Sequence, residues 1–147
     1  MSQENQTNRL PLIGWREYLS LPTLGIDKIK AKIDTGAKTS ALHAFNVEII
    51  NQDNQEIVKF EIHPIQKDNQ TSVIATVKLW EYRAVKNSGG GVEKRPVIMT
   101  TVSIGNYEWE IALTLTNRDA MGFRMLLGRD AVKNRFLVDC GNSFLHN

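Results

Sequence analysis

Residues 26–33 alternate charged and apolar side chains with a period of two residues. Three lysines fall on one side of this segment, and Ile29, Ala31 and Ile33 fall on the other. Such alternation is typical of a β-strand with one buried face. A buried face has to pack against further strands or helices, so the segment limits the chain to folds that contain a sheet.

Strand patterns recur along the rest of the chain, whereas helical patterns are scarce. Turn residues separate several of the strands, and Gly105-Asn106 fits a two-residue hairpin. A helix is predicted at 129–134, directly after Gly128. We therefore expect an all-β barrel or sandwich with one short C-terminal helix. Further strands are predicted at 12–15, 18–21, 45–50, 56–62, 73–82, 95–104, 107–115, 135–139 and 143–145.

Length and composition are those of one folded domain. The 147 residues are 41% hydrophobic and 23% charged, which excludes a disordered chain or a coiled coil. The net charge of +2 is too small to predict binding to nucleic acid. No apolar run reaches the roughly 18–20 residues that cross a membrane. We expect a flexible polar tail over 1–9, a single domain over 10–147, and a cytoplasmic location without membrane contact.

The strand predicted at 26–33 leads into the loop Asp34-Thr35-Gly36-Ala37. A carboxylate at the end of a strand is held rigidly, as a catalytic group has to be. The glycine lets backbone amides approach the carboxylate, and the small alanine leaves space for a substrate. The same residues also fit an Asx turn, in which the aspartate caps its own backbone. The tripeptide alone leaves both interpretations open and favours the turn.

A second segment shifts the preference from the Asx turn towards a catalytic aspartate. Residues 123–132 form an apolar run that ends in Gly128-Arg129 before the predicted helix. Together the two segments resemble the retropepsin-like aspartic peptidases, in which an apolar-apolar-Gly-Arg segment supports an Asp-Thr-Gly-Ala loop. The chain is most similar to the bacterial branch labelled ATP-dependent zinc proteases, through residues 34–44, 115–119 and 125–129.

The resemblance implies a closed six-stranded acid-protease barrel and an aspartic endopeptidase or peptidase. A hairpin of that family, the flap, closes over substrate, and the glycines at 89–91 occupy its place in the order. The implied site has three parts. They are the catalytic Asp34, Thr35 and Gly36, the substrate-binding Ala37, Lys38, Gly89, Gly90 and Gly91, and the supporting Leu127, Gly128 and Arg129.

Aspartic proteolysis needs a second carboxylate. Asp139, in Asp139-Cys140-Gly141, mimics the motif but is interpreted as part of a closing turn. The second aspartate would then be Asp34 of another copy, brought close by a two-fold axis. The resemblance implies a homodimer with interleaved terminal strands, and without such use of residues 140–145 the chain would rest as a monomer.

Lys38 departs from the family pattern, because an acidic residue usually follows the alanine of the loop and pairs with the arginine. Arg129 would then need another carboxylate, for which Asp119 and Asp130 are the candidates. Lys38, extended by Lys30 and Lys32 of the preceding strand, would favour acidic peptides.

Metal and nucleotide binding find little support. The histidines at 43, 63 and 146 match no zinc motif, and Cys140 is the only cysteine. Residues 89–94 lack the ending of a phosphate-binding loop. We therefore expect no cofactor. The alternative function is a peptide- or protein-binding module on the same fold that does not hydrolyse its ligand.

Overall fold

The computed structural model describes residues 9–65, 70–86, 89–118 and 122–146. Apart from Arg9, the predicted tail lies outside this range. Within it, no helix is long and apolar enough to cross a membrane. The elements are β1 (Leu12–Gly14), β2 (Arg16–Leu21), η1 (Pro22–Leu24), β3 (Ile26–Asp34), β4 (Ser40–His43), β5 (Phe45–Gln52), β6 (Gln55–Ile62), β7 (Val73–Lys78), β8 (Glu81–Lys86), β9 (Val92–Ile104), β10 (Tyr107–Thr116), β11 (Met125–Gly128), α2 (Arg129–Val132) and β12 (Leu137–Asp139).

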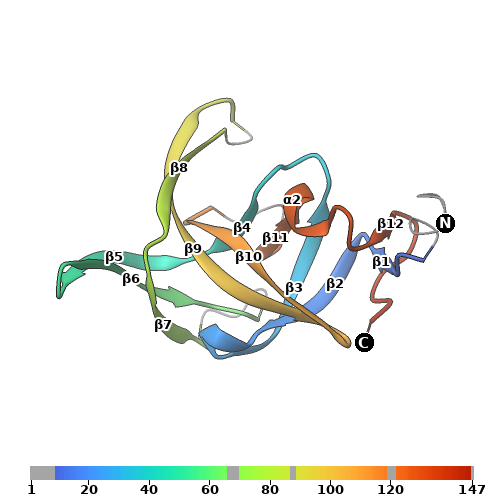
Figure 1. Cartoon of the computed structure of the whole chain (residues 1–147), viewed down its shortest axis with the longest axis horizontal. Coiled ribbons are helices and arrows are strands. Elements are labelled where there is room, and N and C mark those ends of the chain that lie inside the picture. The colour runs from blue at the N-terminus through green and yellow to red at the C-terminus, as the bar shows by residue number, and fades with distance from the viewer. Residues whose placement is uncertain (1–8, 66–69, 87–88, 119–121, 147) are drawn as a thin grey trace.

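The main sheet has the order β10-β4-β11-β3-β2-β9-β8, and β9 also pairs with β10 (Figure 1). The pairing therefore runs around six strands and returns to its start. Between β2 and β9 it consists of one residue pair, Ser20 and Ser103, so the sheet is not closed into a complete barrel. The all-β acid-protease type of fold with one short C-terminal helix is confirmed, with the ring incomplete on one side.

The alternation of β3 places its apolar residues in the core as predicted. Ile29, Ala31 and Ile33 are buried. On the other face, the Lys28 ammonium lies 4.2 Å from the centre of the Tyr18 ring. Lys30 likewise lies over an aromatic ring, that of Phe123. These two lysines cover aromatic surface, which accounts for part of the lysine row without any ligand.

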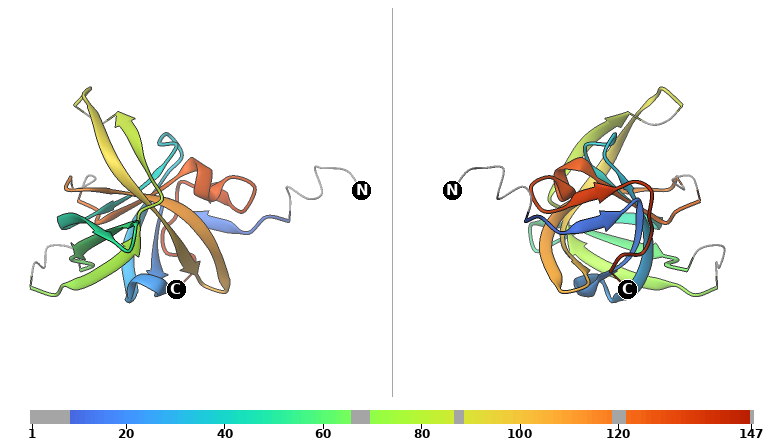
Figure 2. Two further views of the ribbon diagram at one scale, coloured as in Figure 1. Left: turned by 60° about the vertical axis from the view of Figure 1, so that its left-hand side comes forward. Right: turned by 90° about the vertical axis from the view of Figure 1, so that its right-hand side faces the viewer.

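Two smaller sheets flank the main one. A three-stranded sheet, β5-β6-β7, extends from one side of the molecule, and β1 pairs with β12 in parallel near the termini (Figures 1 and 2). The strand predicted at 73–82 is two strands, β7 and β8. The chain changes partner between them, because Leu79 N donates to Glu56 O and Trp80 N donates to Val97 O.

The C-terminal residues 143–145 do not form the predicted strand. Phe144 N donates to Arg16 O, and the amide of Leu145 bonds to a side chain, the carboxylate of Glu17. Glu17 is fully buried and accepts hydrogen bonds from Leu145 N at 2.9 Å, His146 N at 3.2 Å and Gly14 N at 2.8 Å. The carboxylate thus satisfies amides that a strand would have satisfied with a neighbouring backbone.

Candidate active site

The Asp34 loop and the glycine-arginine segment lie side by side. Strand β11 pairs in parallel with β3, so that Gly128 stands opposite Asp34 in the register. The same strand also contacts β4, which begins directly after the loop. The loop is therefore carried by three adjacent strands, with α2 next to it (Figure 1). The two segments that the sequence analysis joined are neighbours in space.

The Asp34 carboxylate lies at the surface of its loop. Its Oδ1 atom accepts a hydrogen bond of 3.0 Å from Gly36 N, the geometry of an Asx turn. Asp34 is nevertheless half-buried, and Thr35 and Gly36 are exposed. The turn interpretation is therefore correct in its geometry, and it leaves the carboxylate within reach of a ligand.

The start of α2 holds this loop through three hydrogen bonds. Arg129 Nη1 donates to Thr35 O at 3.0 Å. Arg129 N donates to Ala37 O at 2.7 Å, and Asp130 N donates to Lys38 O at 3.0 Å. Each carbonyl from Thr35 to Lys38 except that of Gly36 thus has a donor in α2, and the shape of the loop is determined by the helix.

Among the described residues, Arg129 has a backbone carbonyl, that of Thr35, in place of the expected carboxylate partner. Of the two candidates, Asp130 pairs instead with Lys133, at 3.4 Å, and Asp119 lies outside the described residues. The guanidinium needs no acidic residue after Ala37 in this arrangement, which is compatible with a lysine at position 38.

Gly128 fits a space that no larger residue could occupy. A Cβ atom there would lie 2.7 Å from the carbonyl carbon of Thr39 and 2.9 Å from Ser40 N. Gly128 N also donates to Ser40 Oγ at 2.9 Å. Leu127, before it, is fully buried. Ser40 is a supporting residue that the sequence analysis missed, and only its hydroxyl next to the loop could have indicated it.

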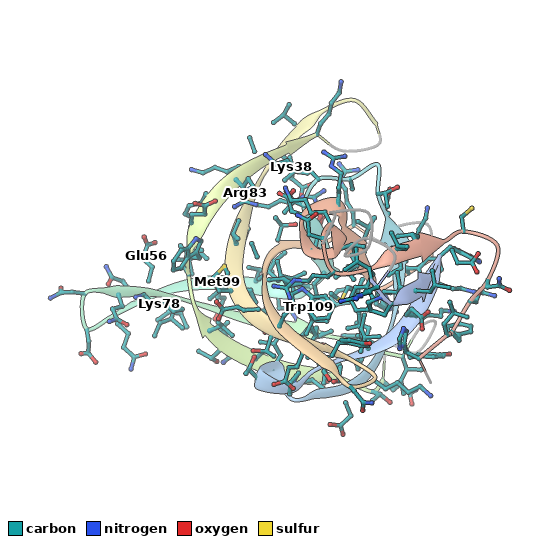
Figure 3. The ribbon with its side chains drawn as sticks, turned by 45° about the vertical axis from the view of Figure 1, so that its right-hand side comes forward. Lys38, Glu56, Lys78, Arg83, Met99 and Trp109 are labelled. Carbon is teal, nitrogen blue, oxygen red and sulfur yellow. The ribbon has the colours of Figure 1, made fainter. Side chains whose placement is uncertain are left out.

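A polar pocket of about 230 Å³ opens beside the loop. Thr39, two residues after the loop, and Arg83 of β8 both line it, whereas residues 34–38 are not among its lining residues. Figure 3 shows Lys38 and Arg83 in the upper part of the molecule, with Trp109 below them. No motif in the sequence indicated Arg83. The remaining lining residues are Ser40, Trp109, Glu110, Ile111, Ala112, Asp130, Ala131 and Arg135.

The glycines at 89–91 lie at the tip of a hairpin, as predicted. Lys86 of β8 pairs with Val92 of β9 directly below the tip. Gly90 has a φ of 87° and no heavy atom within 4 Å of the position of a Cβ. The hairpin rises clear of the other strands (Figure 2). This shape fits the flap that the resemblance implies.

No metal site emerges from the part of the chain that the structure describes, where no group of three or more histidine, cysteine or acidic residues could hold an ion. The histidines bond elsewhere: His43 Nδ1 accepts from Arg124 Nη1, His63 Nε2 donates to Glu61, and His146 Nε2 donates to Leu12 O.

Asp139 closes a turn, as predicted. Its two carboxylate oxygens accept hydrogen bonds from the Asn142 side chain at 2.8 Å and from Gly141 N at 3.1 Å. These bonds, that of Asn142 foremost, hold the pKa of Asp139 below its usual value. The charged form is therefore the one that the turn requires.

The strand-end Asp-Thr-Gly loop, the Gly-Arg segment beneath it and the glycine-tipped hairpin define a retropepsin-like domain. The chain belongs to the RimB-like family, whose model is described as retropepsin-like aspartic endopeptidase RimB and matches residues 12–147.

Curated relatives carry a different name. A protein of Shewanella halifaxensis is 44% identical over 133 residues, which are 90% of this chain and 29% of the relative. One of Desulfotalea psychrophila is 48% identical over 128 residues, or 87% and 28%. Both are named probable alpha-L-glutamate ligase. This chain therefore spans less than a third of their length.

A solved structure shares the fold. The crystal structure of a Legionella pneumophila protein of unknown function superimposes with a TM-score of 0.77 at 27% identity. The match covers 93% of this chain and 98% of that one.

Proposed function

We propose that this chain is an aspartic peptidase in which Asp34 of one copy and Asp34 of a second copy activate a water molecule. The observation that carries the proposal is the half-buried Asp34 carboxylate, presented on a loop that α2 holds in shape. Membership of the retropepsin-like family supports it.

The chemistry follows from two carboxylates about 3 Å apart, which cannot both ionise cheaply and therefore share one proton. The charged one accepts a proton from water as the water attacks the peptide carbonyl, and the other donates to the carbonyl oxygen. The pair titrates as a unit, so neither aspartate has a fixed role before substrate binds.

The neighbouring residues then have distinct roles. Thr35 would bond to the partner loop and fix the pair of aspartates, and the backbone of Gly36 would line the groove. Ala37 leaves space for substrate, and the tip at 89–91 covers it. Bonding to a partner loop and lining a groove both require accessible residues, and Thr35 and Gly36 are both exposed.

The substrate class that we propose is an acidic peptide, in particular one with α-linked glutamate residues. Lys38 is exposed next to the catalytic loop, and Arg83 lines the pocket beside it. The Arg83 guanidinium is already paired with the Glu81 carboxylate, at 2.6 Å, so Lys38 is the cation that favours carboxylate side chains. The name of the curated relatives, probable alpha-L-glutamate ligase, points to the same amino acid.

We propose that two copies pair through a surface other than residues 140–145. Residues 140–145 are bound to their own chain, where Trp15 N donates to Asn142 O and Phe144 N donates to Arg16 O. Sedimentation at several protein concentrations tests the pairing. A monomer at every concentration, with or without substrate, would exclude a shared pair of aspartates.

The decisive experiment compares Asp34→Asn with Asp139→Asn, because both aspartates cap a glycine two residues later. Hydrolysis of a glutamate-rich peptide should fall by about 10²–10⁴-fold in Asp34→Asn. Asp139→Asn should keep wild-type turnover. Equal turnover in wild type and Asp34→Asn would exclude the proposal.

The second candidate is a binding module that does not hydrolyse its ligand. The hydrogen bond from Gly36 N to Asp34 favours it, because a purely structural aspartate would have the same contact. In that case wild-type protein would bind glutamate-rich peptides in calorimetry and release no product on prolonged incubation, at any concentration or pH.

A further inference from the structure

The glycine-tipped hairpin is attached to the body on one side only. Strands β8 and β9 pair with each other from Lys86 and Val92 down to Glu81 and Val97. The pairing of β9 with β10 starts at Val97. Residues 92–96 therefore pair with β8 but not with β10, and they form part of an arm that extends above the sheet (Figure 2).

One carboxylate crosses from this arm to the end of β10. Glu93 Oε1 accepts a hydrogen bond of 2.9 Å from Thr116 Oγ1. Its Oε2 atom accepts one of 3.1 Å from Arg118 Nε. Arg95, also in the arm, lies 3.4 Å from the same carboxylate. Glu93 thus joins two cations and a hydroxyl.

The end of β10 to which Glu93 bonds is itself held in place by hydrogen bonds. Thr116 is buried, and its carbonyl accepts a hydrogen bond of 2.8 Å from Ala44 N. Its hydroxyl also accepts one from Arg118 N at 3.2 Å. Since the Glu93 side chain is itself only 25% exposed, the connection is partly shielded from solvent.

Apolar packing at this junction is loose. A hollow of about 560 Å³ lies between the arm, the start of β5 and the end of β10, and Glu93 is among its lining residues together with Val47 and Val92. Val92 is 73% exposed. With little apolar contact beside it, the polar connection through Glu93 contributes much of what orients the arm.

We propose that Glu93 is a positioning residue that latches the glycine-tipped hairpin to the end of β10 and so sets its angle beside the pocket that Arg83 and Thr39 line. The catalytic consequence rests on the proposed function, whereas the latch itself does not. Release of the latch lets the hairpin swing away from the groove, and substrate is then held less tightly.

Hydrogen exchange of the purified full chain tests the latch directly. In Glu93→Ala, backbone amides at 81–86 and 92–95 should exchange at least fivefold faster than in wild type, and those of β3 and β11 should not change. Thr116→Val and Arg118→Ala, which remove one partner each, should give smaller increases. Glu48→Gln, on exposed β5, is the matched control and should have no effect.

The milder Glu93→Gln keeps the size of the side chain and guards against loss of folding. In wild type, 1 M NaCl should speed exchange of the hairpin amides, because salt screens the partly exposed ion pair. In Glu93→Gln that salt effect should be absent. Unchanged exchange in both Glu93 variants would overturn the latch.

Kinetics separate the latch from the peptidase. With a glutamate-rich peptide, Glu93→Gln should raise KM several-fold with kcat within about twofold of wild type. Faster exchange together with no hydrolysis by wild type would support the latch and reject the peptidase. Hydrolysis that Asp34→Asn abolishes, together with unchanged exchange and KM in Glu93→Gln, would reject the latch and support the peptidase.

Discussion

The Arg129 guanidinium donates a 3.0 Å hydrogen bond to the carbonyl of Thr35, a residue 94 positions earlier in the chain. The arginine thereby holds the residue next to Asp34 by its backbone, whatever side chain follows Ala37. This arrangement allows the lysine at position 38, where a pairing acidic residue was expected.

We expect Arg129→Ala to lower peptidase activity at least tenfold and stability by only about 0.5–1.5 kcal/mol. The bond is exposed, so its loss costs little folding energy, but the loop that presents Asp34 loses one of its three ties. Peptide turnover and urea denaturation measure the two effects. Arg16→Ala is the control, since that arginine bonds to Ser143 and lies over the Trp15 ring, outside the pocket, and an equal loss of activity there would contradict the assignment.

Gly128→Ala should destabilise the protein by about 1–3 kcal/mol and displace the loop, because the new methyl group would lie 2.7 Å from the carbonyl carbon of Thr39. Thermal denaturation measures the loss. Gly141→Ala is the matched substitution, since its Cβ would lie 3.6 Å from the nearest atom, Asp139 Oδ1. A similar loss in both variants would mean that the close approach at Gly128 is unimportant.

Lys38→Glu should reverse the preference between acidic and basic peptides, with kcat/KM for a glutamate-rich peptide falling about tenfold, the equivalent of about 1.4 kcal/mol. Attraction of that size is reasonable between charges near a protein surface. Lys28→Glu is the control, because Lys28 lies over Tyr18. Should wild type cleave acidic and basic peptides equally, Lys38 would have no part in specificity.

Glu17→Ala should lower the free energy of unfolding by about 3 kcal/mol or more. Three backbone amides lose their acceptor, and each unsatisfied buried donor costs about 1–3 kcal/mol. Urea denaturation gives the value. Glu48→Ala, at an exposed position, should stay within about 0.5 kcal/mol of wild type. A loss below 1 kcal/mol at Glu17 would show that the C-terminal contact is dispensable.

The turn at Asp139 should weaken in acid. The folded pKa of Asp139 lies below its usual value of 3.8, so the bonds to Asn142 and Gly141 contribute stability above that value. That contribution is lost as the pH falls through the folded pKa. An NMR titration of the carboxyl carbon should give a midpoint below 3.8 in wild type and a higher one in Asn142→Ala. A wild-type midpoint at or above 3.8 would be inconsistent with these bonds.

Local pattern predicted the strand that carries Asp34, because the residues of β3 alternate. The link between the Asp34 loop and the glycine-arginine pair came from the resemblance to the retropepsin-like family, and the pairing of β11 with β3 places the two segments side by side. Strand β4 was not predicted, because Ser40–His43 is buried throughout and so shows no alternation of buried and exposed residues. Such a strand is recognised only once its neighbours are known.

Long-range polar contacts could not be predicted from the sequence. Glu17 looks like an ordinary charged residue between the strands predicted at 12–15 and 18–21, yet it is fully buried and bonds to a segment 128 positions away. The carbonyl partner of Arg129 could not be predicted either. Every residue has a carbonyl, and only the path of the backbone decides which one lies close to the guanidinium.

The pairing of Gly128 with Asp34 has a consequence for how the protein matures. The two halves of the site come from distant parts of the polypeptide, and contacts of such separation form slowly, because ordering the intervening chain costs entropy first. A partly folded molecule would have Asp34 without the Gly128-Arg129 segment that supports its loop. Under the proposed function, hydrolytic capacity would arrive at the end of folding, when the molecule no longer exposes cleavable segments of itself.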